Sequence, residues 1–343
     1  MKINKEFVLE TAKALLEHHS PSGFCFEIMD EIRKYAERFG YAFETTRKGC
    51  GIITVPGKSD EKVIGLSAHV DTLGAMVRSI TGSGTLKFTL VGGPIAATLD
   101  GEYCKIRTRS GKIYTGTFLS TSPAAHVYED ASSKARNANN MEVRIDEVVK
   151  CKQDVEELGI ANGDYIFIEP KTTITESGYI KSRFIDDKGS VAGLMGLLEA
   201  LSREQVTPSY TVKIFISVYE EVGHGSSYIP EDITEMIAVD MGCIGEDLSC
   251  SEQDVSICAK DSGGPYDYQM TSKLIELAKE NDLRYVVDIY PMYGSDVGAA
   301  LRGGNNIRGA LIGPGVHASH GMERTHYEGL ENTIKLLFAY ITQ

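Results

Sequence analysis

Two adjacent carboxylates follow a short apolar run and could divide a catalytic task between them. Glu220 and Glu221 come after residues 211–216, a β-branched and aromatic run that predicts a buried strand. Neighbouring strand residues point to opposite faces, but Gly223 and Gly225 predict a turn, where both acids can face one site. One acid could bind a metal ion while the other moves a proton. The plain alternative is a solvated strand end.

Further acids and histidines stand at other expected strand ends and in two loops. They are His69, Asp71, Asp186, Asp187, Asp240, His317 and His320. In open α/β sheets the ligand crevice lies outside the carboxyl ends of the strands, so these side chains should converge there. Two histidines, a bridging carboxylate and two more carboxylates suit a pair of Zn²⁺ or similar borderline ions.

A pair of metal ions predicts a hydrolytic reaction. Ions ~4 Å apart can hold a hydroxide between them and polarise a carbonyl, which leaves one free carboxylate as a base. The spacing of His69 and Asp71 also fits, because residues i and i+2 of a strand share a face. We therefore expect the carboxylate of Asp71 to accept from the second ring nitrogen of a metal-bound His69 and to fix its tautomer.

An alternation of helices and strands surrounds a stretch of different texture. Residues 74–171 hold short alternating runs broken by Gly and Pro, with little helix, which predicts a small all-β unit. Before and after this stretch, helical spacing alternates with buried apolar runs. The sequence therefore predicts a catalytic α/β domain over residues 1–73 and 172–343, with a β domain inserted over 74–171.

Composition excludes several classes of protein. The 343 residues carry a formal charge of −13, with 48 acidic residues against 35 Lys and Arg, which argues against a nucleic-acid surface. No apolar run approaches the ~20 residues of a membrane span, and the charged first residues differ from a secretion signal. Seven cysteines without a Cys-x-x-Cys spacing fit reduced thiols. We expect a soluble, cytoplasmic protein.

Five ordered motifs resemble those of a known peptidase family. They are His69-Val70-Asp71-Thr72, Ser182-Arg183-Phe184-Ile185-Asp186-Asp187-Lys188, Glu220-Glu221-Val222-Gly223, Val239-Asp240-Met241-Gly242 and Ser319-His320-Gly321-Met322-Glu323-Arg324-Thr325-His326. Their order, over nearly the whole chain, is similar to that of the tetrahedral aminopeptidases. This co-catalytic metallo-aminopeptidase family includes glutamyl and deblocking aminopeptidases. The expected β insert stands where that family has its oligomerisation domain.

The resemblance implies a fold and a role for each motif residue. The implied fold is a mixed-sheet, zinc-exopeptidase-like α/β domain with an inserted barrel-like domain. The implied ligands of two divalent ions, Zn²⁺ or Co²⁺, are His69 and Asp240 for one ion, Glu221 and His320 for the other, and a bridging Asp186. Glu220 would be the general base that takes a proton from the bridging water and passes it to the leaving amine, with Asp71 behind His69.

Some residues leave a choice open or have a plain structural explanation. Spacing alone cannot choose among His317, His320 and His326, although the run Ser-His-Gly-x-Glu-Arg-Thr-His favours His320. Asp187 is interpreted as supporting the site or capping the following helix. Ser295-Asp296 predicts first an N-cap and only then a supporting role. Residues 255–259 predict an edge strand.

The function that follows is a two-metal aminopeptidase acting on peptides with a free amino end. By resemblance, the insert would pair subunits into dimers, and dimers into a tetrahedral dodecamer. The nearest alternative is a related co-catalytic hydrolase, either a carboxypeptidase or an N-acyl amino-acid deacylase. A glycoside hydrolase is disfavoured because its carboxylates must lie ~5–10 Å apart across a sugar bond. A non-catalytic metal-binding scaffold is disfavoured because Glu220 remains as a spare base.

Overall fold

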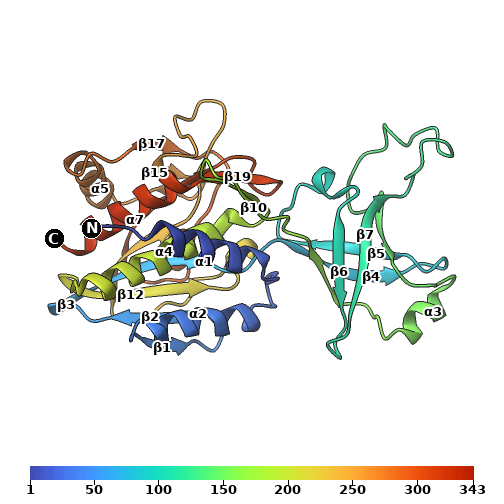
Figure 1. Cartoon of the computed structure of the whole chain (residues 1–343), viewed down its shortest axis with the longest axis horizontal. Helices are drawn as coiled ribbons and strands as arrows, with labels where there is room; N and C mark the ends of the chain where they lie inside the picture. Colours follow the sequence, from blue (N-terminus) through green and yellow to red (C-terminus); the bar gives the residue numbers. More distant parts are fainter. The chain divides into compact units, whose positions relative to one another are not determined.

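The chain folds into two compact units. The computed structural model describes residues 1–343. Unit 1 comprises Met1–Thr72 and Lys171–Gln343, and unit 2 comprises Leu73–Pro170 (Figure 1). Unit 2 is an insertion, because strands from both parts of unit 1 pair in one sheet. The predicted α/β fold with an inserted barrel is confirmed.

A mixed sheet forms the centre of unit 1. Its strands follow the order β1-β2-β12-β3-β13-β18-β15-β16, and β17 pairs with β15. The bounds are β1 (Ala42–Thr45), β2 (Gly51–Val55), β3 (Ser59–His69), β12 (Tyr210–Ser217), β13 (Ile233–Val239), β15 (Val255–Asp261), β16 (Gly264–Pro265), β17 (Tyr285–Ile289) and β18 (Arg308–Val316). The central strands β12, β3, β13 and β18 run parallel, so their carboxyl ends meet at one edge of the sheet.

The expectation of an edge strand at residues 255–259 is wrong. β15 pairs with β18 on one side and with β17 on the other. Val255, Ile257 and Cys258 are fully buried. A short apolar run cannot distinguish an edge strand from an interior one, and the strand that covers β15 begins only at Tyr285, after helix α5.

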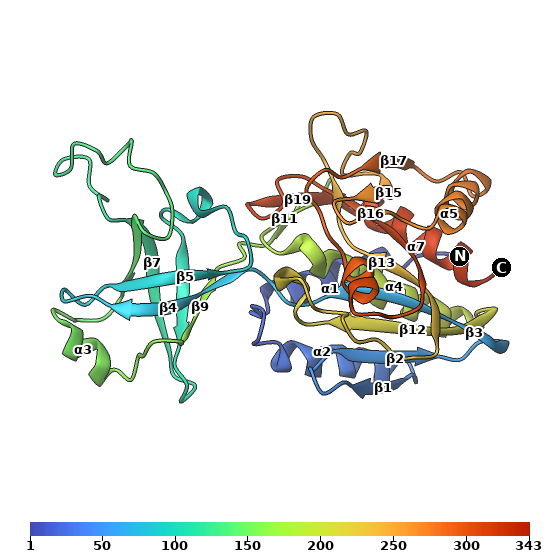
Figure 2. The ribbon, with the colours of Figure 1, turned by 180° about the vertical axis from the view of Figure 1, so that it is seen from behind.

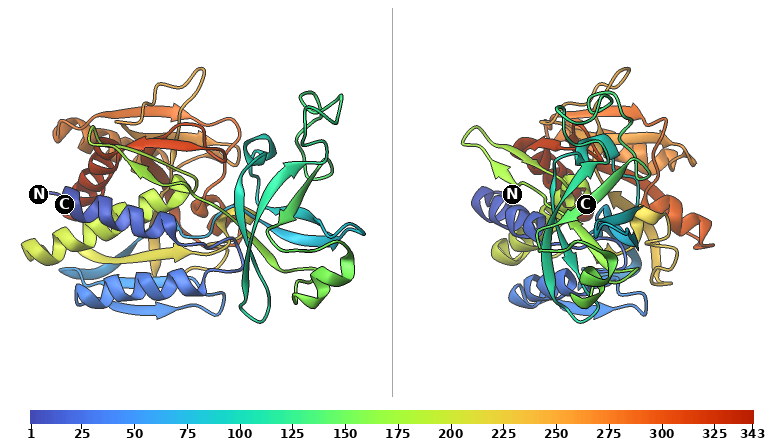
Figure 3. Two further views of the ribbon diagram at one scale, coloured as in Figure 1. Left: turned by 45° about the vertical axis from the view of Figure 1, so that its right-hand side comes forward. Right: turned by 90° about the vertical axis from the view of Figure 1, so that its right-hand side faces the viewer.

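Helices cover the sheet. They are α1 (Lys5–Glu17), α2 (Phe26–Arg38), α4 (Ile185–Glu204), α5 (Tyr268–Glu280), α6 (Asp296–Arg302) and α7 (Tyr327–Ile341). Every residue from Ile185 to Leu201 in α4 is buried, because α1 and α7 flank this helix and β3 and β18 lie against it (Figure 3). A helix whose central residues are almost all apolar belongs in such an interior position. The short α6 packs against β3, β13 and β18.

A small second sheet leads the chain into α4. It contains β10 (Thr173–Ile174), β11 (Tyr179–Ser182) and β19 (Glu323–His326) in that order. β11 ends only a few residues before the acids at the start of α4. A further short strand, β14 (Gly242–Cys243), pairs with the end of β18. No helix of the structure has both the length and the apolar character needed to cross a membrane.

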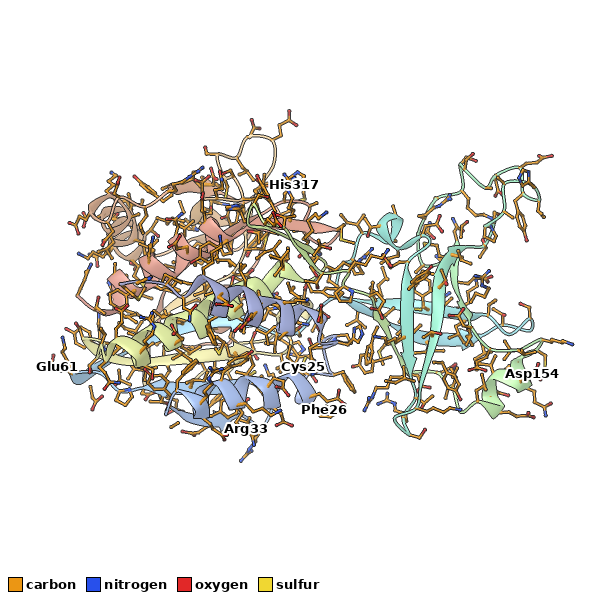
Figure 4. The ribbon with its side chains drawn as sticks, viewed as in Figure 1. Cys25, Phe26, Arg33, Glu61, Asp154 and His317 are labelled. Atoms are coloured by element: carbon orange, nitrogen blue, oxygen red, sulfur yellow. The ribbon has the colours of Figure 1, made fainter.

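Unit 2 is a closed barrel with the strand order β4-β5-β8-β7-β6-β9 (Figure 2). Its elements are β4 (Gly74–Ile80), β5 (Leu86–Val91), η1 (Ala96–Leu99), β6 (Tyr103–Arg107), β7 (Ile113–Ser120), β8 (Met141–Ile145), α3 (Lys152–Glu157) and β9 (Tyr165–Ile168). The rings of Phe88 and Phe118 meet edge-to-face inside it, 5.0 Å apart. Helix α3, which carries the labelled Asp154, was not predicted (Figure 4).

Candidate active site

Strand ends bring acidic and imidazole side chains together at the carboxyl edge of the central sheet. His69 ends β3, and Asp240 directly follows β13. Glu220 and Glu221 open the 3₁₀ turn η2 (Glu220–Val222), three residues after β12. Asp186 lies at the start of α4, where the first turn is not yet helical. All of these residues belong to unit 1, and the sheet topology explains their convergence.

Asp186 lies at the centre of one cluster. Its Oδ1 is 3.2 Å from Nε2 of His69, and its Oδ2 is 3.6 Å from Nε2 of His320. The same His320 nitrogen is 3.7 Å from Oε2 of Glu221. One ligand atom from each of His69, Asp186 and Glu221 lies within 4.8 Å of the others. These nitrogen and oxygen donors are a set that suits a borderline divalent ion.

A second cluster shares His69 with the first. It joins ligand atoms of His69, Asp187 and Asp240, again within 4.8 Å of one another. Asp187 is fully buried, and its Oδ2 accepts the main-chain N–H of His69 at 3.2 Å. Its other oxygen points to no hydrogen-bond donor. Asp187 therefore supports the His69 backbone and also has one oxygen available to the cluster.

Asp71 supports the site differently from expectation. The Nδ1 atom of His69 lies 2.9 Å from the main-chain oxygen of Asp71, and 3.7 Å from its carboxylate. The partner of the ring is therefore corrected from the carboxylate to the carbonyl. The reason is that β3 ends at His69, so the strand rule for residues i and i+2 no longer applies. The carboxylate instead accepts the N–H groups of Glu220 at 3.1 Å and Glu221 at 3.3 Å, and the hydroxyl of Ser22 at 2.5 Å.

The site concentrates negative charge away from water. Burial raises the pKa of Glu221 well above its usual range, and the neighbouring Asp186 adds to the effect. Burial, with Asp186 again contributing, raises the pKa of Asp240 to about 7. Burial lowers the pKa of His69, but its hydrogen bond to Asp186 and the surrounding carboxylates outweigh this and raise it. Buried acids this close require protons or cations to neutralise them.

Unpartnered buried oxygens show that the residues fit metal ions. Oδ1 of Asp187 and Oε1 of Glu221 are both buried and have no hydrogen-bond donor. Buried carboxylate oxygens are normally paired. Divalent cations held among these residues would supply the missing partners and offset the repulsion among the acids.

The family of the chain follows from its sequence. The family described as M42 glutamyl aminopeptidase matches residues 49–336. The chain belongs to this family. YhfE of Bacillus subtilis (strain 168), which carries an aminopeptidase name, is 46% identical over 334 residues, covering 97% of this chain and 96% of that protein. M42 peptidases depend on metal ions, and the chain is an enzyme of this aminopeptidase class.

Solved structures share the fold of this M42 chain. A TET aminopeptidase from the marine sediment archaeon Thaumarchaeota archaeon SCGC AB-539-E09 has a TM-score of 0.88 at 21% identity, covering 98% of this chain and 97% of that one. The TET1 peptidase of Pyrococcus horikoshii, which can assemble into a tetrahedron or a large octahedral shell, has a TM-score of 0.84 at 21% identity, covering 98% and 99%. The similarity spans both units.

Two other candidate histidines lie outside both clusters. His317 is exposed and pairs with Arg324 only through the main chain (Figure 4). His326 is buried at the start of α7, where its Nδ1 accepts the N–H of Glu328 and its Nε2 lies 2.7 Å from the oxygen of Ser177. Of the three candidates, only His320 lies within 4 Å of Asp186 and Glu221.

Glu323 has a role that the sequence analysis missed. Its Oε2 accepts the N–H of Asp186, and its Oε1 accepts the N–H of His320, both at 3.0 Å. One buried side chain thus fixes the backbones of two residues of the cluster. Its position three residues after His320 was the available signal, although spacing alone does not reveal which N–H groups a carboxylate accepts.

A cavity of about 270 Å³ opens onto the acids of the site. Its lining residues are Asp186, Glu220, Glu221, Gly223, Asp240, Met292, Tyr293, Gly294, Ser295, Arg302 and His320. No sequence pattern indicated Met292, Tyr293 and Arg302, because they come from the loop before α6 and from the end of that helix. Such a cavity suits a small part of a substrate, such as one amino-acid residue.

Proposed function

We propose that this M42 enzyme holds two divalent ions, Zn²⁺ or Co²⁺, and removes N-terminal residues from peptides with a free amino end. The observation that carries the proposal is the geometry of Asp186, whose two oxygens face two different histidines at 3.2 Å and 3.6 Å. A carboxylate in this position is suited to bridging two ions. We assign His69 and Asp240 to one ion, and Glu221 and His320 to the other.

The two cations would polarise the substrate carbonyl and make an attacking water more acidic. Glu220 is then the general base. Its Oε2 lies 3.7 Å from Nε2 of His69, so its carboxylate faces the ligand cluster although the assigned ligand set does not require it. Glu220 takes a proton from the attacking water and gives it to the leaving amine, which becomes a good leaving group only when protonated.

Asp71 is a positioning residue in this mechanism. It accepts the main-chain N–H groups of both Glu220 and Glu221 and is itself fully buried. This arrangement fixes the first turn of η2 and so directs one acid to the base position and the other to the ligand position. Positioning of this kind contributes to rate because a base must lie within hydrogen-bond reach of the proton that it removes.

The substrate amine gives the specificity for peptide ends. Glu220, Glu221 and Asp240 line the cavity, and a protonated amino group can pair with a carboxylate there. An acylated amino group carries no charge and loses this interaction. This difference favours an aminopeptidase over a deacylase or a carboxypeptidase acting at the same centre.

We also propose an assembly and a location. The Pyrococcus horikoshii TET1 peptidase can form a tetrahedron, and the shared fold supports self-association of this chain, through unit 2, from dimers to a tetrahedral dodecamer. All seven cysteines are free thiols, which supports a reducing compartment such as the cytoplasm. Enclosure in a shell would restrict the substrates to short or unfolded peptides.

The direct test is a panel of amino-acid nitroanilides and their N-acetylated counterparts. We expect release of nitroaniline from the free-amine compounds, because only these present a cation to the acid-rich cavity. The acetylated compounds should react more slowly by at least about 10²-fold, the scale of one lost charge-assisted contact in a buried site. Release of acetate from the acetylated compounds, without release of nitroaniline from the free-amine compounds, would instead identify a deacylase.

Arg302 provides a prediction about the preferred first residue. It is the only lysine or arginine that lines the cavity, and it forms no ion pair with a carboxylate. The family description names glutamyl residues, and a guanidinium is suited to bind their side chains. We expect Arg302→Gln to lower kcat/KM for a glutamyl nitroanilide about 10–10²-fold, and to leave leucyl hydrolysis within about twofold.

The matched control for this prediction is Arg47→Gln. Arg47 is exposed and lines a different cavity. This variant should retain the ratio of glutamyl to leucyl hydrolysis. An equal loss for both substrates in Arg302→Gln would contradict a role in selecting acidic residues.

A further inference from the structure

Asp296 is a buried acid that the mechanism above does not use. It is only 2% exposed, although it lies at the beginning of α6, where an N-cap was expected. The N-cap residue is indeed Ser295, but its hydroxyl does not cap the helix and instead pairs with the hydroxyl of Tyr266 at 2.7 Å. The carboxylate of Asp296 therefore does not cap α6, and its contacts indicate a different structural role.

The contacts of Asp296 lie on both sides of the turn that carries Glu220. Its Oδ2 accepts the hydroxyl of Ser217 at 2.8 Å, and Ser217 is the last residue of β12 before the turn. The main-chain oxygen of Asp296 accepts the hydroxyl of Ser226, which follows the turn. Asp296 is thus hydrogen-bonded to the chain both before and after Glu220.

The second oxygen of the carboxylate packs directly against the turn. Oδ1 is buried and has no hydrogen-bond donor. A Cβ atom added at Gly225 would lie 2.7 Å from this oxygen, 2.8 Å from the hydroxyl of Ser217 and 3.0 Å from the main-chain nitrogen of Glu220. The absence of a side chain at Gly225 therefore allows Asp296, Ser217 and Glu220 to approach one point. A buried carboxylate oxygen without a hydrogen-bond donor is unfavourable. The presence of an aspartate at this position therefore indicates a role other than stabilising the fold.

Contacts on other sides complete the support of the turn. Asp71 accepts the N–H of Glu220. Nζ of Lys48 donates to the main-chain oxygen of Gly225 at 3.1 Å and to the hydroxyl of Ser227 at 2.8 Å. Within the turn, the N–H of His224 donates to the main-chain oxygen of Tyr219 at 3.1 Å. Asp296 adds a connection from α6, because its side chain contacts Ser217 before Glu220 and its main-chain oxygen contacts Ser226 after it.

We propose that Asp296 is a positioning residue for Glu220: by accepting the hydroxyl of Ser217 and packing against Gly225, its carboxylate fixes the turn from which the base reaches the attacking water. This inference rests on the proposed function, in which Glu220 is the base. Loss of the Asp296 side chain lets the turn move, and Glu221 moves with it because it lies in the same turn, whereas the metal ligands of β3, β13 and α4 keep their own supports. A displacement of about 1 Å at a catalytic group costs about 10²-fold in rate.

The test compares kcat, KM and metal content across four variants. Asp296→Ala and Ser217→Ala remove the same hydrogen bond from its two ends. Assayed with excess metal, so that the ion held by Glu221 stays bound, both should lower kcat about 10–10²-fold with KM unchanged. Asp296→Asn retains an acceptor for Ser217 and should restore kcat to within about fivefold of the parent. In the double variant Asp296→Ala/Ser217→Ala, the loss should be no greater than in the worse single variant, because only one interaction is lost.

Thr333→Val is the control for lost stability. It removes a buried hydroxyl that donates to the oxygen of Gly329 at 2.8 Å in α7, and it should lower the unfolding temperature without changing kcat. Ser217→Ala changes little volume and provides the measurement if Asp296→Ala does not fold. Parent kcat in Ser217→Ala, or a loss in Asp296→Asn equal to that in Asp296→Ala, would overturn the proposal.

Glu220→Gln separates this inference from the function on which it rests. If Glu220→Gln is inactive while the Asp296 and Ser217 variants keep the parent kcat, the positioning role alone is wrong. If the parent does not hydrolyse the free-amine compounds, or if Glu220→Gln keeps the parent rate, both proposals are wrong.

Discussion

Glu220→Gln is expected to keep the metal content of the parent and to lose about 10²–10⁴-fold in kcat, the range that general-base catalysis contributes. Glutamine has the shape of glutamate but cannot accept the proton of the attacking water. The main-chain N–H of residue 220 would still donate to Asp71 at about the same place, so the turn should keep its conformation. Steady-state hydrolysis of a free-amine nitroanilide and metal analysis of the same sample measure both quantities.

Glu221→Gln is the matched control, because it makes the same chemical change one residue away. Oε2 of Glu221 lies 3.7 Å from Nε2 of His320, in the ligand cluster. This variant should therefore lose metal as well as activity, and excess metal should restore part of the rate. If both variants retained metal equally and lost equal activity, the division between base and ligand would be wrong.

Asp186→Asn is expected to lose at least one of the two ions and more than about 10²-fold in kcat/KM. Even the removal of a residue that only supports a ligand typically costs about 10–10² in metal affinity, so the removal of a bridging ligand should exceed this. The structural reason is that each oxygen of Asp186 faces a different histidine. Metal analysis after dialysis against metal-free buffer, followed by activity measurement, tests this prediction.

Asp282→Asn is a suitable control for Asp186→Asn. Asp282 is exposed, and its positive φ of 51° is a conformation that asparagine also adopts readily. This variant should bind metal as the parent does. Full metal content and full activity in Asp186→Asn would exclude Asp186 as the bridging ligand.

Much of the fold could be predicted because its hydrophobic patterns are local. The parallel strands are apolar runs bounded by turns, and the alternating runs of the insert differ clearly from them. Which strands pair with each other was harder to predict from the sequence. β15 was mistaken for an edge strand because β17, which covers it, follows a whole helix later in the chain.

The supporting side chains of the site were harder to predict than the residues of the two clusters. His69, Asp186 and Asp240 stand at strand or helix ends, where type and position together indicate a site. The purpose of Asp71 and Glu323 depends instead on which main-chain N–H groups approach their carboxylates. Such contacts join segments far apart in the sequence, and no local pattern encodes them.

Reconstitution with metal shows whether the aminopeptidase activity requires two bound ions. The parent protein, stripped with a chelator, is titrated with Zn²⁺ or Co²⁺ while hydrolysis of a free-amine nitroanilide is followed. We expect no hydrolysis by the stripped protein and a rise in rate that reaches its plateau at about two ions per chain, as a two-metal hydrolase requires. Full activity of the stripped protein, or two bound ions without hydrolysis of any free-amine substrate, would contradict the proposed function.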